Sequence, residues 1–229
     1  KTGSGIRTDS LRGRITTHIL FSRRGCIYYI LMTHILALNG SPRRNGNTET
    51  VLNAFLDGAK EAGASVETIR LSALSFKNCL GCNACHQKGV CILKDDLTEV
   101  FEKVMACDIL VLASPIYSMT VTAEMKGFID RGQFLWAQKF KTQTLVFDEK
   151  HLETHIGVFL STSGQALPVM FDAAFPVVRA LFNDAGFSYT ENVLFAGMDV
   201  HGGVKSWPES VDEAFARGKE IAQRLINEP

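Results

Sequence analysis

The sequence predicts an α/β protein with a doubly wound, five-stranded parallel sheet and helices on both faces. Short apolar runs alternate with stretches of helical periodicity along residues 32–227, which is the pattern of a parallel α/β sheet. Two runs, 109–113 and 156–160, are apolar without interruption, as expected of strands that are buried on both faces. Right-handed crossovers between such strands place helices on both sides of the sheet.

The expected elements follow in order along the chain. Apolar runs predict strands at 35–38, 66–71, 109–113, 156–160 and 189–196. Apolar residues at the spacing of one helix face predict helices at 48–62, 97–106, 121–134, 167–185 and 209–227. Gly63 and Gly186 follow two of these helices as stop signals. Residues 72–95 are expected to form a long loop.

Composition limits the function classes. A chain of 229 residues fits one α/β domain. Residues 1–31 hold six basic residues and one acid, which leaves 18 basic and 23 acidic residues in the remainder. This mildly acidic body gives no electrostatic reason to expect nucleic acid as a partner. No apolar run is long enough to span a bilayer, so no membrane association is expected.

Residues 1–31 differ from the rest of the chain in charge and pattern. Met32 directly precedes the first expected strand. We therefore expect a domain at 32–229 and an N-terminal extension at 1–31 that is an artefact or a disordered arm. A basic partner-binding arm and a targeting segment are the alternatives, although no small-residue cleavage site precedes the domain.

The turn after the first strand carries the first chemical motif, Gly40-Ser41-Pro42-Arg43-Arg44-Asn45-Gly46-Asn47-Thr48. A helix that starts at the carboxyl edge of such a sheet offers free backbone N–H groups to an anion. Short polar side chains and two arginines add donors suited to phosphate. The turn lacks both the Gly-x-Gly-x-x-Gly and the Gly-Lys-Ser/Thr patterns. It therefore predicts a monophosphate ligand, with an ordinary capped polar turn as the alternative.

Four cysteines form the second motif, with the spacing Cys-x2-Cys-x2-Cys-x5-Cys: Cys79, Cys82, Cys85 and Cys91. Thiolates at three-residue steps can surround one face of an iron–sulfur cubane, and the fourth can complete it. A functional [4Fe-4S] site, cysteines without a cluster, and a zinc site or redox disulfide all remain open. So tight a group favours a reducing, cytoplasmic location over a secreted disulfide framework.

The phosphate-loop motif resembles that of the NADPH-dependent FMN reductase-like flavoproteins. The resemblance continues in Ser114-Pro115-Ile116-Tyr117-Ser118 and in Lys126-Gly127-Phe128-Ile129-Asp130-Arg131, and covers roughly residues 32–164. The cysteine spacing resembles the iron-sulfur flavoprotein branch of the same family. This resemblance implies a flavodoxin-like fold and FMN held across three loops. The implied cofactor-binding residues are Ser41, Arg43, Asn45, Gly46, Asn47 and Thr48; Pro115, Ile116, Tyr117, Ser118 and Met119; and Ser161, Thr162, Ser163 and Gly164.

The resemblance also implies a function. FMN would take electrons from NAD(P)H and pass them, with a [4Fe-4S] cluster on the four cysteines, to or from a small-molecule redox substrate or an electron-carrier protein. No side chain is expected to be catalytic, because the flavin carries the chemistry. The alternatives are a cluster-free NAD(P)H-dependent FMN or quinone reductase and a zinc-stabilised binding module. We expect a homodimer or homotetramer, with Phe134-Leu135-Trp136 covering a neighbour's flavin. Asp130 and Arg131 are expected to form an ion pair or an oligomer contact.

Overall fold

The computed structural model describes residues 17–21 and 27–227. The chain divides into two units that meet at Met32 and Thr33. In the first unit, β1 (Thr17–Phe21) and β2 (Ile27–Leu31) pair antiparallel, and these strands were not expected. The six basic residues that set the charge of this segment lie outside the described residues. The interpretation of residues 1–31 as an artefact or arm stays a prediction.

A five-stranded parallel sheet forms the centre of the second unit, in the order β4-β3-β5-β6-β7. All five predicted strands are confirmed, as β3 (His34–Asn39), β4 (Ser65–Arg70), β5 (Ile109–Pro115), β6 (Ile156–Thr162) and β7 (Ser188–Phe195). The chain runs from β3 outward to β4 and then returns past β3 to β5. The topological switch point therefore lies between the carboxyl ends of β3 and β5, where doubly wound sheets bind ligands.

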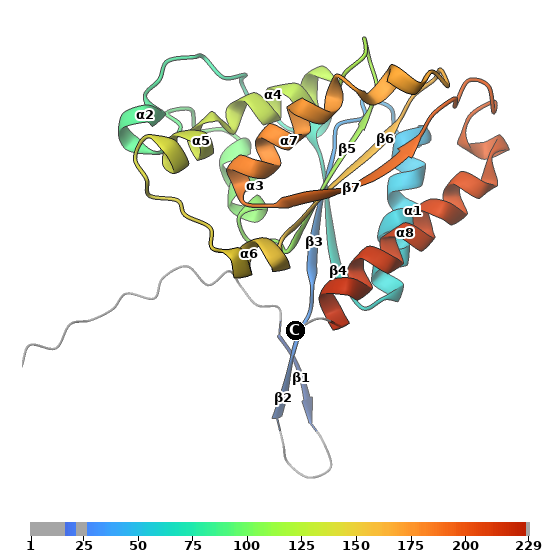
Figure 1. Ribbon diagram of the computed structural model, residues 1–229, viewed down its shortest axis with the longest axis horizontal. Coiled ribbons are helices and arrows are strands. Elements are labelled where there is room, and N and C mark those ends of the chain that lie inside the picture. The colour runs from blue at the N-terminus through green and yellow to red at the C-terminus, as the bar shows by residue number, and fades with distance from the viewer. Residues whose placement is uncertain (1–16, 22–26, 228–229) are drawn as a thin grey trace, which may run out of the picture. The chain divides into compact units, whose positions relative to one another are not determined.

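Helices cover both faces of this sheet, as predicted (Figure 1). One face carries α1 (Asn47–Glu61) and α8 (Pro208–Asn227). The other carries α3 (Leu97–Val104), α4 (Ala123–Arg131) and α7 (Ala174–Ala185), with α5 (Gln133–Phe140) beside them. No helix in the part of the chain that the structure describes combines the length and hydrophobicity needed to cross a bilayer.

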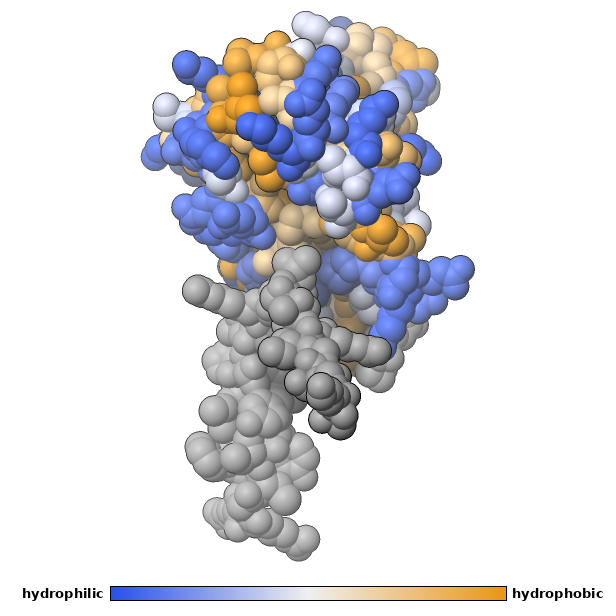
Figure 2. All heavy atoms as spheres, turned by 90° about the vertical axis from the view of Figure 1, so that its left-hand side faces the viewer, coloured by the Kyte–Doolittle hydropathy of each residue, from blue (hydrophilic) through white to orange (hydrophobic). Residues whose placement is uncertain are grey.

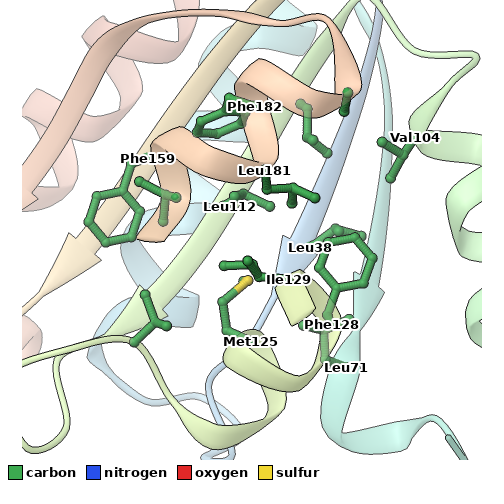
Figure 3. Close-up of a cluster of buried hydrophobic side chains, with 14 of the residues drawn as sticks. Leu38, Leu71, Val104, Leu112, Met125, Phe128, Ile129, Phe159, Leu181 and Phe182 are labelled. Carbon is green, nitrogen blue, oxygen red and sulfur yellow. The ribbon is translucent and has the colours of Figure 1, made fainter. Parts of the chain in front are cut away.

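Alternation along the strands divides the core into two clusters. Ile35 and Ala37 of β3 face α1 and α8, whereas Leu36 and Leu38 face the opposite helices. The second cluster is shown in Figure 3, where Phe128 of α4 and residues of α7 converge on Leu38 and Leu112. Both faces of the sheet are therefore buried, which accounts for the uninterrupted apolar runs in the sequence.

A pair of glycines lets α1 and α8 cross closely. A Cβ atom at Gly58 would overlap the Phe215 carbonyl oxygen, and one at Gly218 would overlap the Phe55 carbonyl oxygen. The two helix backbones are therefore in direct contact, and neither position has room for a side chain.

Two predicted helices are divided in the structure. The helix expected at 121–134 becomes α4 and α5 with Gly132 between them, where a Cβ atom would lie 2.7 Å from Leu181 Cδ1 of α7. The helix expected at 167–185 becomes the 3₁₀ turn η2 (Pro168–Phe171) followed by α7. Proline favours the first turn of a helix, so Pro168 begins a separate turn.

Short elements also appear where none were expected. The 72–95 loop contains the end of the 3₁₀ turn η1 (Leu71–Ala73) and the one-turn helix α2 (Cys85–Lys88). A further helix, α6 (Glu149–Thr154), starts at Asp148, whose carboxylate accepts a 2.8 Å hydrogen bond from the His151 N–H. Such caps supply the acceptors that the first turn of a helix lacks. The turn η3 (Val204–Ser206) follows β7.

Candidate functional site

The loop after β3 ends at a helix N-terminus with open donors. Gly46 caps α1 in an extended conformation, with no side-chain hydrogen bond to the first turn. Within the described residues, the backbone N–H groups of Asn47 and Thr48 have no acceptor. Asn45, with φ at 53°, turns the chain into this cap. The open N–H groups and the positive end of the helix dipole together form an anion site.

The loop is held in shape without a ligand. Asn39 Oδ1 accepts a 2.9 Å hydrogen bond from the Ser41 N–H, and Ser41 Oγ accepts one of 3.3 Å from the Arg43 N–H. Ser41 is buried, so its side chain holds the loop from the interior of the domain. Arg70, the last residue of β4, donates a 2.9 Å hydrogen bond to the Ser41 carbonyl oxygen.

Arg70 also connects this loop to the first turn of α1. Its guanidinium pairs with Glu49, and Glu49 in turn accepts a hydrogen bond from the Asn45 N–H. The negative charge of Glu49 is therefore matched by a cation within the loop itself. Neither residue was predicted: Arg70 lies 29 positions after Ser41 on another strand, and the motif was read only as far as Thr48, one residue before Glu49.

Both arginines of the loop are exposed, and neither forms an ion pair within the described residues. Arg43 starts beside the cap: a Cβ atom added to Gly46 would lie 3.1 Å from Arg43 Cβ. An exposed arginine whose Cβ lies beside a helix N-terminus with open backbone N–H groups suits a phosphate group. The loop therefore fits the predicted monophosphate.

Two predicted donors use their side chains to connect loops. Thr48 Oγ1 lies 2.6 Å from Thr162 Oγ1 in a buried pair, and Asn47 Oδ1 accepts a 3.1 Å hydrogen bond from the Val204 N–H. The backbone N–H groups of Asn47 and Thr48 and the Asn47 Nδ2 amide group remain for an anion. The Thr48 hydroxyl joins α1 to the end of β6, and Asn47 Oδ1 joins it to the loop that follows β7.

The loop after β5 forms a tight turn at Tyr117–Thr120. Its two ends exchange backbone hydrogen bonds of 2.9 and 3.1 Å, and Ser118 and Met119 have φ values of 48° and 69°. Tyr117 and Met119 are 41% and 43% exposed, whereas Thr120 Oγ1 is buried and has no partner among the described residues. The turn thus offers an apolar surface formed by Tyr117 and Met119. Pro115, at the end of β5, and Ile116 are buried behind it.

Polar side chains fix both the end of β6 and the loop after it. Ser161 Oγ, on β6, donates a 2.7 Å hydrogen bond to the Ser114 carbonyl oxygen of β5, and Ser163 Oγ, in the loop, donates one of 2.8 Å to that of Gln165. A Cβ atom at Gly164 would overlap the Asp199 carboxylate. Asp199 therefore occupies the space where a side chain of residue 164 would lie, and the implied role of Gly164 in cofactor binding stays a prediction.

A fourth loop, residues 197–206 after β7, reaches the same edge of the sheet. The Met198 N–H donates a 2.9 Å hydrogen bond to the Ser163 carbonyl oxygen, and the Asp199 N–H donates one of the same length to that of Gly164. The sequence analysis did not include this loop. Its place after the last parallel strand could have indicated it, because the carboxyl ends of parallel strands share one edge.

The four motif cysteines line one open cavity, together with Arg131 and Phe134. All four are free thiols; Cys79 and Cys82 are exposed, and Cys85 and Cys91 are partly buried. Burial raises the pKa of Cys85, and the three neighbouring sulfurs raise it further. The structure therefore places the four predicted ligands on one cavity, although no group of three or more His, Cys, Asp or Glu side chains among the described residues is arranged to hold a metal ion. On the side of the domain that carries α2 and α5, hydrophobic residues lie among hydrophilic ones (Figure 2).

Arg131 is the buried cation of this cavity. Its guanidinium donates hydrogen bonds of 2.6 and 3.2 Å to the two carboxylate oxygens of Asp95, and one of 2.7 Å to the Lys77 carbonyl oxygen. Asp130 pairs instead with Lys126, at 2.8 Å. The predicted ion pairs are present, but each residue has its own partner.

The carboxylate of Asp95 is held in its charged form. Burial raises the pKa of Asp95, but the hydrogen bonds from Arg131 and from the Lys77 N–H outweigh burial and leave this pKa below its ordinary value. Burial likewise lowers the pKa of Arg131, but Asp95 and the Cys91 sulfur outweigh it and leave the pKa raised. The pair is therefore fully ionised at neutral pH.

Phe134, Leu135 and Trp136 all have neighbours within their own domain. Phe134 contacts the ring of Phe101 edge-on at 5.0 Å, Leu135 is buried, and the partly buried Trp136 lies 5.5 Å from the His86 ring. The expectation that this stretch covers a neighbour's flavin stays a prediction.

The comparisons with known proteins decide the family. The profile of the NADPH-dependent FMN reductases matches residues 33–171, which span the first four strands of the sheet and three of the loops described above. The chain belongs to the NADPH-dependent FMN reductase family. Its sheet order and its placement of the loops at the switch point are therefore those of a flavodoxin-like fold.

Relatives within this family carry a more specific name. An iron-sulfur flavoprotein of Archaeoglobus fulgidus is 42% identical over 40% of this chain and 42% of its own length. One of Methanosarcina thermophila is 32% identical over 57% of this chain and 63% of its own length. The chain thus spans about half the length of these relatives. The fold resembles an NAD(P)H:quinone oxidoreductase of Methanothermobacter marburgensis, with a TM-score of 0.66, 20% identity, and coverage of 83% of this chain and 96% of that one.

Proposed function

We propose that this protein is an FMN-dependent oxidoreductase that takes electrons from NAD(P)H. Electrons would pass through FMN, and through a [4Fe-4S] cluster on Cys79, Cys82, Cys85 and Cys91, to or from a small-molecule redox substrate or an electron-carrier protein. The observation that carries the proposal is the uncapped N-terminus of α1 at the switch point of a sheet from this family.

The residues present fit FMN. The N–H groups of Asn47 and Thr48, together with Arg43, would hold the phosphate. The turn at Tyr117–Thr120 offers an exposed apolar surface for the ring. When bound, the flavin supplies the redox chemistry. The chain supplies the binding groups and their orientation.

The cysteine cavity supports a cluster better than it supports zinc. A structural zinc ion requires four ligands that converge on one point, about 2.3 Å from each sulfur. In the described ranges, no group of three or more His, Cys, Asp or Glu side chains is arranged to hold a metal ion, so the support for a cluster is the spacing of the four cysteines and their place on one cavity. A cubane binds each thiolate at a different iron, which suits thiolates at three-residue steps. Structural zinc sites usually use two ligand pairs separated by a longer loop, which leaves the zinc-stabilised binding module with the least support.

The cluster-free NAD(P)H-dependent reductase remains the second candidate. Exposure of Cys79 and Cys82 favours it, because a cluster held by these thiols would be open to solvent and oxygen. The names of the iron-sulfur flavoproteins favour the cluster. The two candidates share the FMN site and differ only in the cysteines.

One experiment tests both halves of the proposal. Anaerobically purified protein is analysed for FMN, iron and acid-labile sulfide, and its visible spectrum is recorded. Flavin bands with a broad shoulder, iron and sulfide are expected. The Cys85→Ser variant should lose iron and keep FMN, whereas the matched control Cys107→Ser, at a buried thiol outside the cavity, should keep both. Absence of FMN after reconstitution sinks the whole proposal, and FMN without iron leaves the cluster-free reductase.

Location and assembly are part of the same proposal. Exposed free thiols persist in a reducing compartment, which supports a cytoplasmic location. The open turn at Tyr117–Thr120 supports a homodimer or homotetramer in which a second subunit covers the ring. Light scattering of the FMN-loaded protein tests the assembly, and a monomer at micromolar concentration contradicts it.

A further inference from the structure

Arg131 has a place in the cysteine cavity that the ion pair with Asp95 does not fully explain. Its side chain is 2% exposed, at the last residue of α4. It lines the same cavity as the four cysteines. Its two terminal nitrogens bond Asp95 and Lys77, but the Nε atom is buried and has no partner among the described residues. A buried, unused N–H donor on a cation costs free energy unless it meets an acceptor.

The arrangement around Arg131 joins the two ends of the cysteine loop. Lys77 precedes Cys79, and Asp95 follows Cys91. Asp95 Oδ2 accepts hydrogen bonds from both Arg131, at 2.6 Å, and the Lys77 N–H, at 3.1 Å. One buried guanidinium therefore holds the start and the end of residues 77–95 together. The opening of the loop is fixed by a residue that lies on α4, outside the motif.

The charge of Arg131 also acts on the sulfurs. Arg131 and Cys91 line the same cavity, so the guanidinium charge lies on the wall that the sulfurs share. A cluster bound by four thiolates is an anion, and hydrogen bonds and charges near its sulfurs set its reduction potential. A cation stabilises the reduced form more than the oxidised form, because reduction adds a negative charge.

We propose that Arg131 is a positioning residue of the cluster site, which closes the cysteine loop through Asp95 and Lys77 and directs its Nε–H and its charge at the cluster beside Cys91. The inference rests on the proposed function, since it assigns a role toward the [4Fe-4S] cluster. It goes beyond that function because it gives Arg131, which lies outside the cysteine motif, a part in setting the reduction potential of the cluster.

The test compares two substitutions that break the same ion pair with opposite effects on charge. Arg131→Met removes a cation and should move the midpoint potential of the cluster to a more negative value. Asp95→Asn removes an anion, leaves Arg131 in place and should move it to a more positive value. Lys126→Met, on the exposed side of the same helix, is the matched control and should leave the potential unchanged. Redox titration followed by electron paramagnetic resonance measures all three.

A second measurement needs no cluster. Hydrogen–deuterium exchange of the protein without its cluster should be faster than in the wild type in residues 77–95 for both Arg131→Met and Asp95→Asn. It should stay unchanged for Lys126→Met. FMN content serves as the control for folding. Arg131→Lys keeps the charge but loses the planar fork. It should keep a potential nearer to that of the wild type than Arg131→Met does, with raised exchange in the loop.

The outcomes separate this inference from the proposed function. Wild-type protein that binds FMN but no iron overturns the cluster, and with it the role of Arg131 toward the cluster. A loaded cluster whose potential is the same in the wild type and in Arg131→Met overturns the inference alone, as do shifts of the same sign for Arg131→Met and Asp95→Asn. If Arg131→Met does not take up the cluster, the midpoint potentials of the cluster in Arg131→Lys and Asp95→Asn are compared instead. A lower potential in Arg131→Lys than in Asp95→Asn supports the inference, and equal potentials overturn it.

Discussion

Replacing Arg43 with Ala is expected to weaken FMN binding and to leave the fold intact. Arg43 is exposed and has no ion pair within the described residues, so its truncation should change the free energy of unfolding by less than about 0.5 kcal/mol. A charge-assisted hydrogen bond to phosphate contributes about 1.5–3 kcal/mol. The loss corresponds to a rise in Kd of about 10- to 150-fold.

The assay uses two ligands that differ only in the phosphate. Apoprotein is titrated into FMN or riboflavin, and Kd is obtained from the quenching of flavin fluorescence. Because riboflavin lacks the phosphate, Arg43→Ala should leave its Kd unchanged. Arg44→Ala is the control at the neighbouring exposed arginine. The loss of FMN affinity in Arg44→Ala should be smaller and should disappear at high salt, because salt screens the long-range attraction between exposed charges more than it screens a direct contact.

Two results refute this reasoning. An unchanged Kd for FMN shows that Arg43 makes no phosphate contact. An equal loss for FMN and riboflavin shows that the substitution disturbs the loop or the ring site. A lower melting temperature of the apoprotein would point to the same structural cause.

Three further predictions follow from the structure. Gly218→Ala should destabilise the protein by about 3 kcal/mol, at the upper end for overpacking, because the new methyl group overlaps the Phe55 carbonyl oxygen. Urea unfolding measures the change in the free energy of unfolding. A variant as stable as the wild type would contradict the close crossing of α1 and α8. Since the pKa of Asp95 is lowered in the fold, its pairing with Arg131 stabilises the protein above the ordinary pKa of about 3.9 and is lost as the pH falls below it. Unfolding measured from pH 5 to pH 2 should therefore show an acid-dependent loss that Asp95→Asn lacks. Burial raises the pKa of Cys107 far above its usual range, so mass spectrometry should find this thiol unalkylated in native protein and alkylated in urea.

The sheet could be predicted because its signal is local. Residues 109–113 and 156–160 are apolar without interruption, and each run alone indicates a strand buried on both faces. The division of the 121–134 helix could not be predicted in this way. Gly132 ends α4 where Leu181 of α7 lies against it, and nothing within the segment itself shows that neighbour.

The same contrast holds for the candidate site: features within a motif could be predicted, and contacts from other strands and loops could not. The start of a helix after the Gly40–Thr48 motif could be predicted, and α1 begins at Asn47. What holds that loop, and what fills the space beside Gly164, comes from Arg70 and Asp199 on other strands and loops. Spacing likewise brought the four cysteines to one cavity, but gave no sign that Arg131 would form its wall.

The link between Arg70 and Glu49 has a consequence for ligand affinity. Glu49 occupies the first turn of α1, where a carboxylate competes with an incoming phosphate for the helix dipole and for the Asn45 N–H. Arg70 neutralises that carboxylate and fixes the Ser41 carbonyl oxygen at the same time. We therefore expect the loop to lose little conformational entropy when it binds the proposed phosphate. Arg70, on the edge strand β4, would then set part of the affinity, and a motif that stops at Thr48 leaves this determinant out.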